Sequence, residues 1–245
     1  MQESIESTRM GVNRTGMQSS PELSKEMLDS MDAVPTEALD GQTLASVRLD
    51  YIEDADPLGS VPPPATLKGM AKSGAKMMTG HRPQAFIDKL AERLAFERGG
   101  TRLYDAVITK FQAFSDELPD LTAQDLLEIR NQEAEHALLV HECLEKLGAD
   151  PTAQTPCADL VGVQTQGLLQ AATDPRTSLA QTLSCALAAE LIDNAGWENL
   201  IELAENMGQS EMAERFTEAL EQETEHLAKV KSWYRALTLE TTELM

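Results

Sequence analysis

Gln132-Glu133-Ala134-Glu135-His136 and Glu223-Thr224-Glu225-His226 are the two stretches that decide the fold, because each contains the pattern Glu-x-x-His. In a helix, residues three positions apart lie on the same face. Each stretch therefore aims one carboxylate and one imidazole in the same direction. The sequence predicts two helices that each present such a pair.

A single inward glutamate precedes each Glu-x-x-His on an earlier helical segment. Glu97 lies 36 residues before Glu133, and Glu190 lies 33 residues before Glu223. A large aromatic residue, Tyr104 or Trp197, follows each lone glutamate by seven positions. The order glutamate, aromatic, turn and Glu-x-x-His therefore occurs twice along the chain.

Apolar residues recur at helical spacing around these motifs and predict four long helices. Their expected ranges are about 83–115, 122–147, 176–207 and 210–237. Residues 149–175 form a long connection, with a further helix expected around 158–172. The predicted fold class is all-α: a four-helix bundle in which two antiparallel pairs are joined by a long crossover.

Residues that are typical of helix starts and helix ends support these boundaries. Pro83 suits a first helical position, and Thr122 followed by Asp125 resembles a capping box. Gly148 and Gly208 are typical of helix ends. Gly99-Gly100 is unusual, because each glycine inside a helix costs about 1 kcal/mol relative to alanine. The pair predicts either close approach of a neighbouring backbone or room beside a site.

The flanking segments are predicted to lie outside the bundle. Residues 1–82 form a polar extension whose apolar patterns, around Met27 and Leu44, are too short for self-standing helices. A proline-rich linker spans 61–64, and a short basic helix is expected to carry Lys68, Lys72 and Lys76 on one face. That face is either solvated or docks on the acidic bundle. Residues 239–245 are expected to fray as a tail.

Composition excludes several classes of function. The 245-residue chain has a formal charge of −21, which argues against nucleic acid and anionic membranes as partners. No apolar run approaches the roughly 20 residues of a membrane span, and the start of the chain has no signal-peptide pattern. Its three cysteines contain no Cys-x-x-Cys and suit a reducing compartment. A cytoplasmic location is expected.

Charge balance predicts what the inward groups bind. An ionised carboxylate in an apolar interior is costly unless it is paired or bound to a cation. The patterns place four glutamates on inward faces and no lysine or arginine beside them, so two divalent cations would balance them. Oxygen and imidazole ligands suit iron or manganese. The predicted metal ligands are Glu97, Glu133, His136, Glu190, Glu223 and His226. Glu133 and Glu223 are expected to bridge the ions, and Glu97 and Glu190 to bind one ion each.

Taken together, these motifs resemble the ferritin-like superfamily, close to bacterioferritin and rubrerythrin. The resemblance covers about residues 83–238 and implies two iron ions, or manganese as the alternative, that react with dioxygen or peroxide. It places Tyr104 beside a terminal carboxylate ligand, and it suggests that the indole of Trp197 plays a similar supporting part.

The sequence departs from those families in three respects. It lacks the cysteine-containing rubredoxin module, and its extension of about 80 residues is foreign to cage-forming ferritins. Asp193 follows Glu190 by three residues, where some rubrerythrin-like proteins have an extra carboxylate. We expect Asp193 to be solvated or to support a ligand, and an auxiliary ligand is the alternative.

Three functions compete at this stage. The first is an oxidoreductase that uses dioxygen or peroxide, and the second is a protein that oxidises and stores Fe²⁺. The third is a helical bundle whose carboxylates no longer bind metal. Storage requires a hollow oligomer, whereas an enzyme is compatible with a homodimer.

Overall fold

A computed structural model describes residues 19–31, 41–64, 66–67, 69–71 and 82–240, with the side chains of 41–43 and 240 excepted. All regular structure in these ranges is helical, so the predicted all-α class is confirmed. The chain divides into two compact units, Thr8–Leu58 and the remainder. None of the described helices is both long enough and apolar enough to cross a membrane.

The described residues of the smaller unit contain two helices, α1 (Pro21–Met31) and α2 (Gly41–Asp54). The expectation that these segments are too short for helices is wrong. Local signals are sufficient for α1, which begins at a proline and carries Glu22 in its first turn. No residue of α1 is buried, so the helix has no apolar core of its own. The basic face predicted for Lys68, Lys72 and Lys76 lies outside the described residues.

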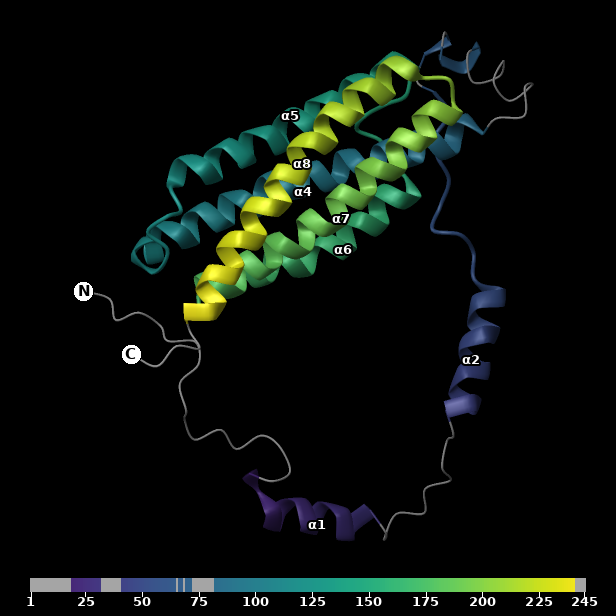
Figure 1. Cartoon of the computed structure of the whole chain (residues 1–245). Helices are drawn as coiled ribbons and strands as arrows, with labels where there is room; N and C mark the ends of the chain where they lie inside the picture. The colour runs from purple at the N-terminus through teal and green to yellow at the C-terminus, as the bar shows by residue number, and fades with distance from the viewer. Residues whose placement is uncertain (1–18, 32–40, 65, 68, 72–81, 241–245) are drawn as a thin grey trace. The chain divides into compact units, whose positions relative to one another are not determined.

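Four long helices form the bundle in the larger unit (Figure 1): α4 (Pro83–Phe114), α5 (Ala123–Leu147), α7 (Leu179–Asn206) and α8 (Ser210–Glu240). The helices α4 and α5 form one pair, joined through the short 3₁₀ helix η2 (Ser115–Glu117), and α7 and α8 form the other. The bundle predicted from the apolar periodicity is therefore present. Its helices begin and end within about three residues of the predicted positions.

Caps fix the ends of the helices. Thr122 and Asp125 form the predicted capping box before α5, and Gly148 ends that helix in the left-handed conformation with φ of 82°. Helix α7 begins three residues later than expected, at Leu179. Ser178 and Gln181 form a second capping box there, which the sequence analysis did not identify.

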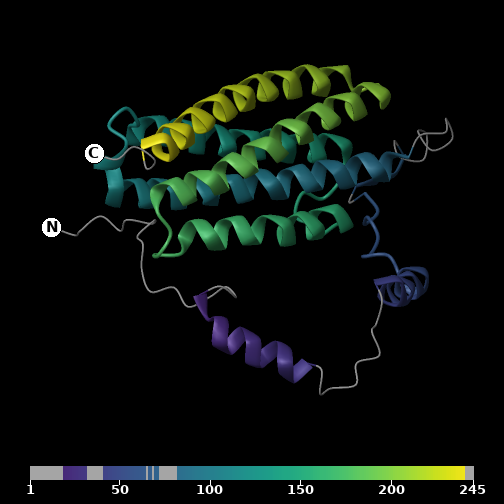
Figure 2. The ribbon, with the colours of Figure 1, turned by 60° about the horizontal axis from the view of Figure 1, so that its bottom comes forward.

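The long crossover is itself helical. Helix α6 (Pro156–Thr173) runs back along the outside of the bundle and packs on α4 and α7 (Figure 2). It extends the expected segment by two residues at its start and one at its end. Because α6 returns the chain to the opposite end of the bundle, α7 runs parallel to α5.

Two apolar clusters fill the bundle, one toward each end. The first includes Leu90, Trp197 and Phe216, and the second includes Val107, Leu126 and Val230. On each of the four long helices, the residues of one cluster precede the inward glutamate and those of the other follow it. The polar site therefore lies between two apolar layers that keep water away from it.

Candidate metal centre

All six residues predicted as metal ligands are buried and converge between the apolar layers. They are Glu97, Glu133, His136, Glu190, Glu223 and His226, and each has 3% or less of its surface exposed. Glu223 belongs to both groups that contain a histidine, one with Glu97 and His136 and the other with Glu133, Glu190 and His226. Within each group the candidate ligand atoms all lie within 4.8 Å of one another. This buried cluster could hold a metal ion.

The two histidines are oriented by a reciprocal pair of glutamines that the sequence analysis did not single out. His136 Nε2 lies 2.7 Å from Oε1 of Gln222, and His226 Nε2 lies 2.7 Å from Oε1 of Gln132. A carbonyl oxygen accepts, so Nε2 carries the hydrogen in both rings. When a ring is neutral, its Nδ1 atom presents a lone pair toward the carboxylates, and when it is protonated, Nδ1 carries a proton toward them. Each glutamine directly precedes the glutamate of a Glu-x-x-His, which is the signal that could have identified it.

Several ligand atoms face one another without the hydrogen bonds that would satisfy them. His136 Nδ1 lies 2.6 Å from Oε1 of Glu223, yet neither atom has a hydrogen-bond partner among the described residues. Both oxygens of Glu97 and one oxygen each of Glu133 and Glu190 are also unpartnered there. Buried polar atoms are rarely left in this state. The donor set therefore fits a cation, which would satisfy these lone pairs together.

The pKa values of the buried glutamates show that most of the carboxylates are destabilised in their ionised form. Burial, followed by repulsion from neighbouring carboxylates, raises the pKa of Glu97 and of Glu133 well above the ordinary value. Burial and the charge of Glu223 do the same for the pKa of Glu190. Glu223 differs: burial alone would raise its pKa, but His136 and His226 outweigh burial and hold the pKa at about 2. Without a cation, the cluster keeps protons on most of its carboxyl groups.

Asp193 belongs to this cluster and is not solvated, so of the roles expected for it only support of a ligand or an auxiliary ligand remain. It is 2% exposed and joins Glu97, Glu133 and Glu223 as a group of candidate ligands. Burial raises the pKa of Asp193 to about 7, although Arg93 opposes that rise. Asp193 follows Glu190 by about one helical turn, so both side chains are expected on the same inward face of the helix. The cluster thus contains five carboxylates.

Arg93 overturns the expectation that no cation shares the inward faces. Its guanidinium is 4% exposed, contacts the carboxylate of Asp193 and lies 3.3 Å from Oε1 of Glu97. Gly196 leaves room for it, since a Cβ there would lie 2.8 Å from Cζ of Arg93. Arg93 precedes Glu97 by four residues, a spacing that places both on one face.

The presence of Asp193 and Arg93 does not change the number of cations that the cluster needs for charge balance. Five carboxylates, each −1, and one guanidinium, +1, leave a formal charge of −4 in the cluster. Two divalent cations would balance that charge. Arg93 is therefore no substitute for metal, because it neutralises only one of the five acids.

The two aromatic residues take different roles. Tyr104 donates a hydrogen bond to Oε1 of Glu190, on the other helix pair, and burial raises the pKa of its hydroxyl so that it stays protonated. Trp197 packs edge-on against His136, with ring centroids 5.6 Å apart. Its indole nitrogen has no hydrogen-bond partner within the described structure. Trp197 thus holds an imidazole by packing and does not match Tyr104 as a donor.

The glycine pair provides room beside the site. A Cβ at Gly100 would collide with the carboxylate of Glu133, whereas a Cβ at Gly99 would lie 3.6 Å from Oγ1 of Thr165 on α6. Only the second spacing is an ordinary contact. Gly100 is therefore required by the site itself.

The fold and this cluster define the class of protein: an all-α bundle with buried carboxylates and imidazoles that could hold metal. The chain belongs to the family described as Domain of unknown function (DUF892), whose sequence profile matches residues 82–243. The match spans α4 to α8 and all of the cluster. No curated protein matches the chain.

Proposed function

We propose that this chain is a ferritin-like dinuclear metal protein that binds two iron ions and reacts with dioxygen or peroxide as an oxidoreductase. The observation that carries the proposal is the convergence of five buried carboxylates and two inward-facing Nδ1 atoms around unsatisfied lone pairs. The long helical crossover and the two Glu-x-x-His motifs support the ferritin-like assignment. Iron held there would supply the electrons that reduce the oxidant.

The surrounding residues prepare the centre for this chemistry. Gln132 and Gln222 hold the imidazoles with Nδ1 directed inward. Asn194 supports the backbone on two helices, since its Nδ2 donates to the carbonyl oxygens of Glu190 and Glu223 at 3.0 Å each. Tyr104 orients the Glu190 carboxylate. The apolar layers exclude bulk water and so preserve the strength of these polar contacts.

The number of oxidant molecules consumed per chain distinguishes an oxidoreductase from a protein that oxidises and stores iron. The metal-free chain is loaded anaerobically with Fe²⁺, and dioxygen or hydrogen peroxide is added with ascorbate as reductant. An oxidoreductase consumes many equivalents of oxidant per chain while its iron content stays at two. Glu133→Ala should abolish this consumption, and Glu135→Ala, an exposed neighbour on α5, should preserve it.

A storage protein behaves differently in the same experiment. It accumulates many irons per chain and elutes as a large hollow oligomer. Consumption of oxidant that stops after one equivalent per centre, with iron accumulation, would replace the oxidoreductase by the ferroxidase alternative. Absence of both consumption and accumulation would remove the proposed reactivity.

A further inference from the structure

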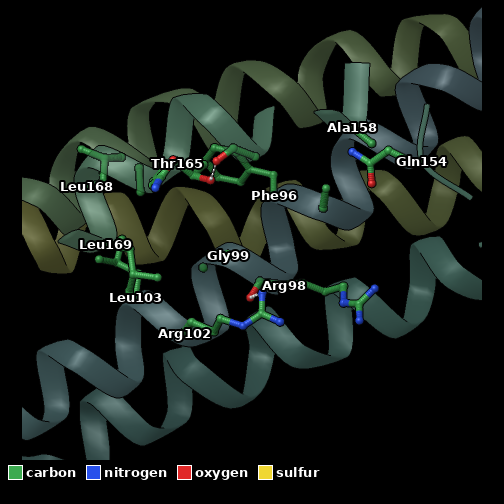
Figure 3. A pocket seen from close by; sticks show the side chains of 15 residues that line it. Phe96, Arg98, Gly99, Arg102, Leu103, Gln154, Ala158, Thr165, Leu168 and Leu169 are labelled. Carbon is green, nitrogen blue, oxygen red and sulfur yellow. Dashed lines mark hydrogen bonds between the residues drawn. The ribbon is translucent and has the colours of Figure 1, made fainter. Parts of the chain in front are cut away.

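A pocket outside the metal cluster lies between α4 and α6. Its volume of about 380 Å³ falls within the roughly 300–1,000 Å³ range of small-molecule sites. Figure 3 shows Phe96, Gly99 and Leu103 of α4 facing Thr165 and Leu168 of α6 across this space. The apolar part of the wall from α4 is formed by Phe96 and Leu103, each of which is 3% exposed or less.

Two of the residues that line the pocket adjoin the metal cluster. Gly100 lines the pocket and also lies so close to the Glu133 carboxylate that a Cβ at position 100 would displace it. Ala189, which lines the pocket from α7, directly precedes Glu190. A ligand in the pocket would therefore be separated from the carboxylates by little more than the backbone of one glycine.

The outer part of the pocket carries positive charge. Arg98 and Arg102 both line it, are exposed, and lie one turn apart on the same face of α4 (Figure 3). Arg102 donates a hydrogen bond to the backbone oxygen of Arg98 at 3.2 Å. In the described parts of the chain, neither guanidinium has a carboxylate within salt-bridge distance. Carboxylates do pair with four other arginines: Arg93, Arg130, Arg176 and Arg215.

Although 41 acidic residues outnumber 20 basic ones in this chain, other described arginines such as Arg48 and Arg235 also lack a carboxylate partner. Arg98 and Arg102 differ from them because both line the same pocket. Many exposed acids were available to neutralise them. Their position beside an apolar space indicates a ligand that carries both an anionic group and an apolar body. Arginine suits a planar carboxylate because its guanidinium can form two parallel hydrogen bonds.

We propose that the pocket between α4 and α6 binds a small organic carboxylate beside the metal centre. The carboxylate pairs with Arg98 and Arg102, and the apolar body lies against Phe96 and Leu103 toward Gly100. This binding is independent of the proposed redox reaction, because it requires only the pocket and its two arginines.

Calorimetric titration of the full chain with 3-phenylpropanoate and with octanoate tests the proposal. At least one of these probes should bind saturably with one site per chain. The neutral amide of that probe should bind at least tenfold more weakly. The double variant Arg98→Gln/Arg102→Gln should show the same tenfold loss for the acid and no change for the amide.

Two glycines of α6 provide a matched pair of variants. Neither would place a Cβ within 4 Å of another group, but Gly162 lines the pocket and Gly167 does not. Both changes to leucine replace an exposed helical glycine by a better helix former, so both variants should fold. Gly162→Leu should fill the pocket and abolish binding, whereas Gly167→Leu should bind as the wild type does.

Three results would overturn the inference: no saturable binding of either acid, equal affinity for acid and amide, or unchanged affinity in Gly162→Leu. Metal content measured on the same samples keeps the two proposals separate. A wild-type chain that retains two metals but binds neither acid would refute the pocket and leave the metal centre intact.

Discussion

The two helix pairs of the bundle carry the same ligand pattern, yet they differ one turn after the lone glutamate. Helix α4 has Gly100 at that position, three residues after Glu97, and α7 has Asp193, three residues after Glu190. The glycine lies between its side of the cluster and the pocket against α6, since it lines that pocket and adjoins Glu133. The aspartate closes the other side with a carboxylate held by Arg93. Repetition thus builds the set of candidate ligands, and departures from repetition make its two sides different.

The two helix pairs also differ in the pKa values of the glutamates in their Glu-x-x-His motifs. Glu133 and Glu223 occupy equivalent positions in the two Glu-x-x-His motifs, but the pKa of the first is raised by burial and that of the second is lowered to about 2. The difference arises because both imidazoles contact Glu223. In the metal-free protein, Glu223 is the anchoring anion and Glu133 retains a proton.

The largest expected effect is on stability as a function of pH. In the metal-free protein, Glu97, Glu133, Glu190 and Asp193 keep protons at pH values where the unfolded chain has lost them. Their contribution to the free energy of unfolding therefore falls as pH rises above about 4.5. His136, whose pKa is raised mainly by Glu223 against the effect of burial, loses its contribution as pH rises above 6.5. Each pKa unit is worth about 1.4 kcal/mol.

Urea unfolding at pH 5 and pH 8, with and without metal, measures this effect. The metal-free chain should be less stable at pH 8 than at pH 5. Metal should stabilise it more at pH 8, because fewer protons then compete for the ligands. Equal metal-free stability at the two pH values would contradict the protonation described for the cluster.

Removing Arg93 should have the largest effect of any single substitution. Arg93→Met leaves Asp193 and Glu97 without their buried cation, and breaking a buried ion pair in this way costs about 3–5 kcal/mol. The second change Asp193→Asn should restore part of the loss, because it removes the uncompensated carboxylate. Arg98→Met, an exposed position on the same helix, should change the free energy of unfolding by less than about 0.5 kcal/mol. Denaturant unfolding of the four proteins decides the matter, and additive effects at 93 and 193 would contradict the pairing.

The glutamines test whether the two helix pairs are equivalent at their histidines. Gln132→Leu frees His226, and Gln222→Leu frees His136. Each change should lower metal affinity about 10–100-fold, as is usual when a residue that orients a metal-binding histidine is lost. Gln170→Leu, an exposed change on α6, should leave the affinity unchanged. Competition with a chelator gives the affinities, and no loss in either variant would show that the glutamines do not orient the rings.

Adding one methyl group at Gly99 or at Gly100 tests the side of the cluster formed by α4, and it is the smallest substitution considered. Gly99→Ala should stabilise α4 by up to about 1 kcal/mol, because its Cβ meets only Thr165 at 3.6 Å. Gly100→Ala should lose that gain, since overpacking costs about 1–3 kcal/mol. It should also lower metal occupancy by displacing Glu133. Thermal melts and metal analysis of both variants would contradict the account if the two behaved alike.

The sequence was sufficient to predict the bundle and the six residues that cluster inside it, because those features are local and periodic. Apolar spacing places Leu90, Leu94 and Glu97 on one face without knowledge of any neighbour. The caps at Thr122 and Gly148 likewise depend on residues close in the chain. The structure brings all six residues together in one buried cluster.

The features that the sequence did not reveal depend on contacts between distant segments. The pairing of Arg93 with Asp193 joins residues 100 positions apart, and the glutamine contacts join α5 to α8. Periodicity indicates only which way such side chains point. The helices of the smaller unit were missed for another reason: their apolar patterns are short, and length was taken as the criterion for a self-standing helix.

The central claim is that the buried carboxylates exist to hold two divalent ions, and elemental analysis of the purified chain tests it most directly. The wild type should contain about two iron or manganese ions per chain, and Glu133→Ala should lose most of them. Glu135→Ala, whose side chain is exposed on the same helix, should retain both. Equal metal content in all three proteins, or no metal in the wild type after loading with Fe²⁺ or Mn²⁺, would contradict the claim.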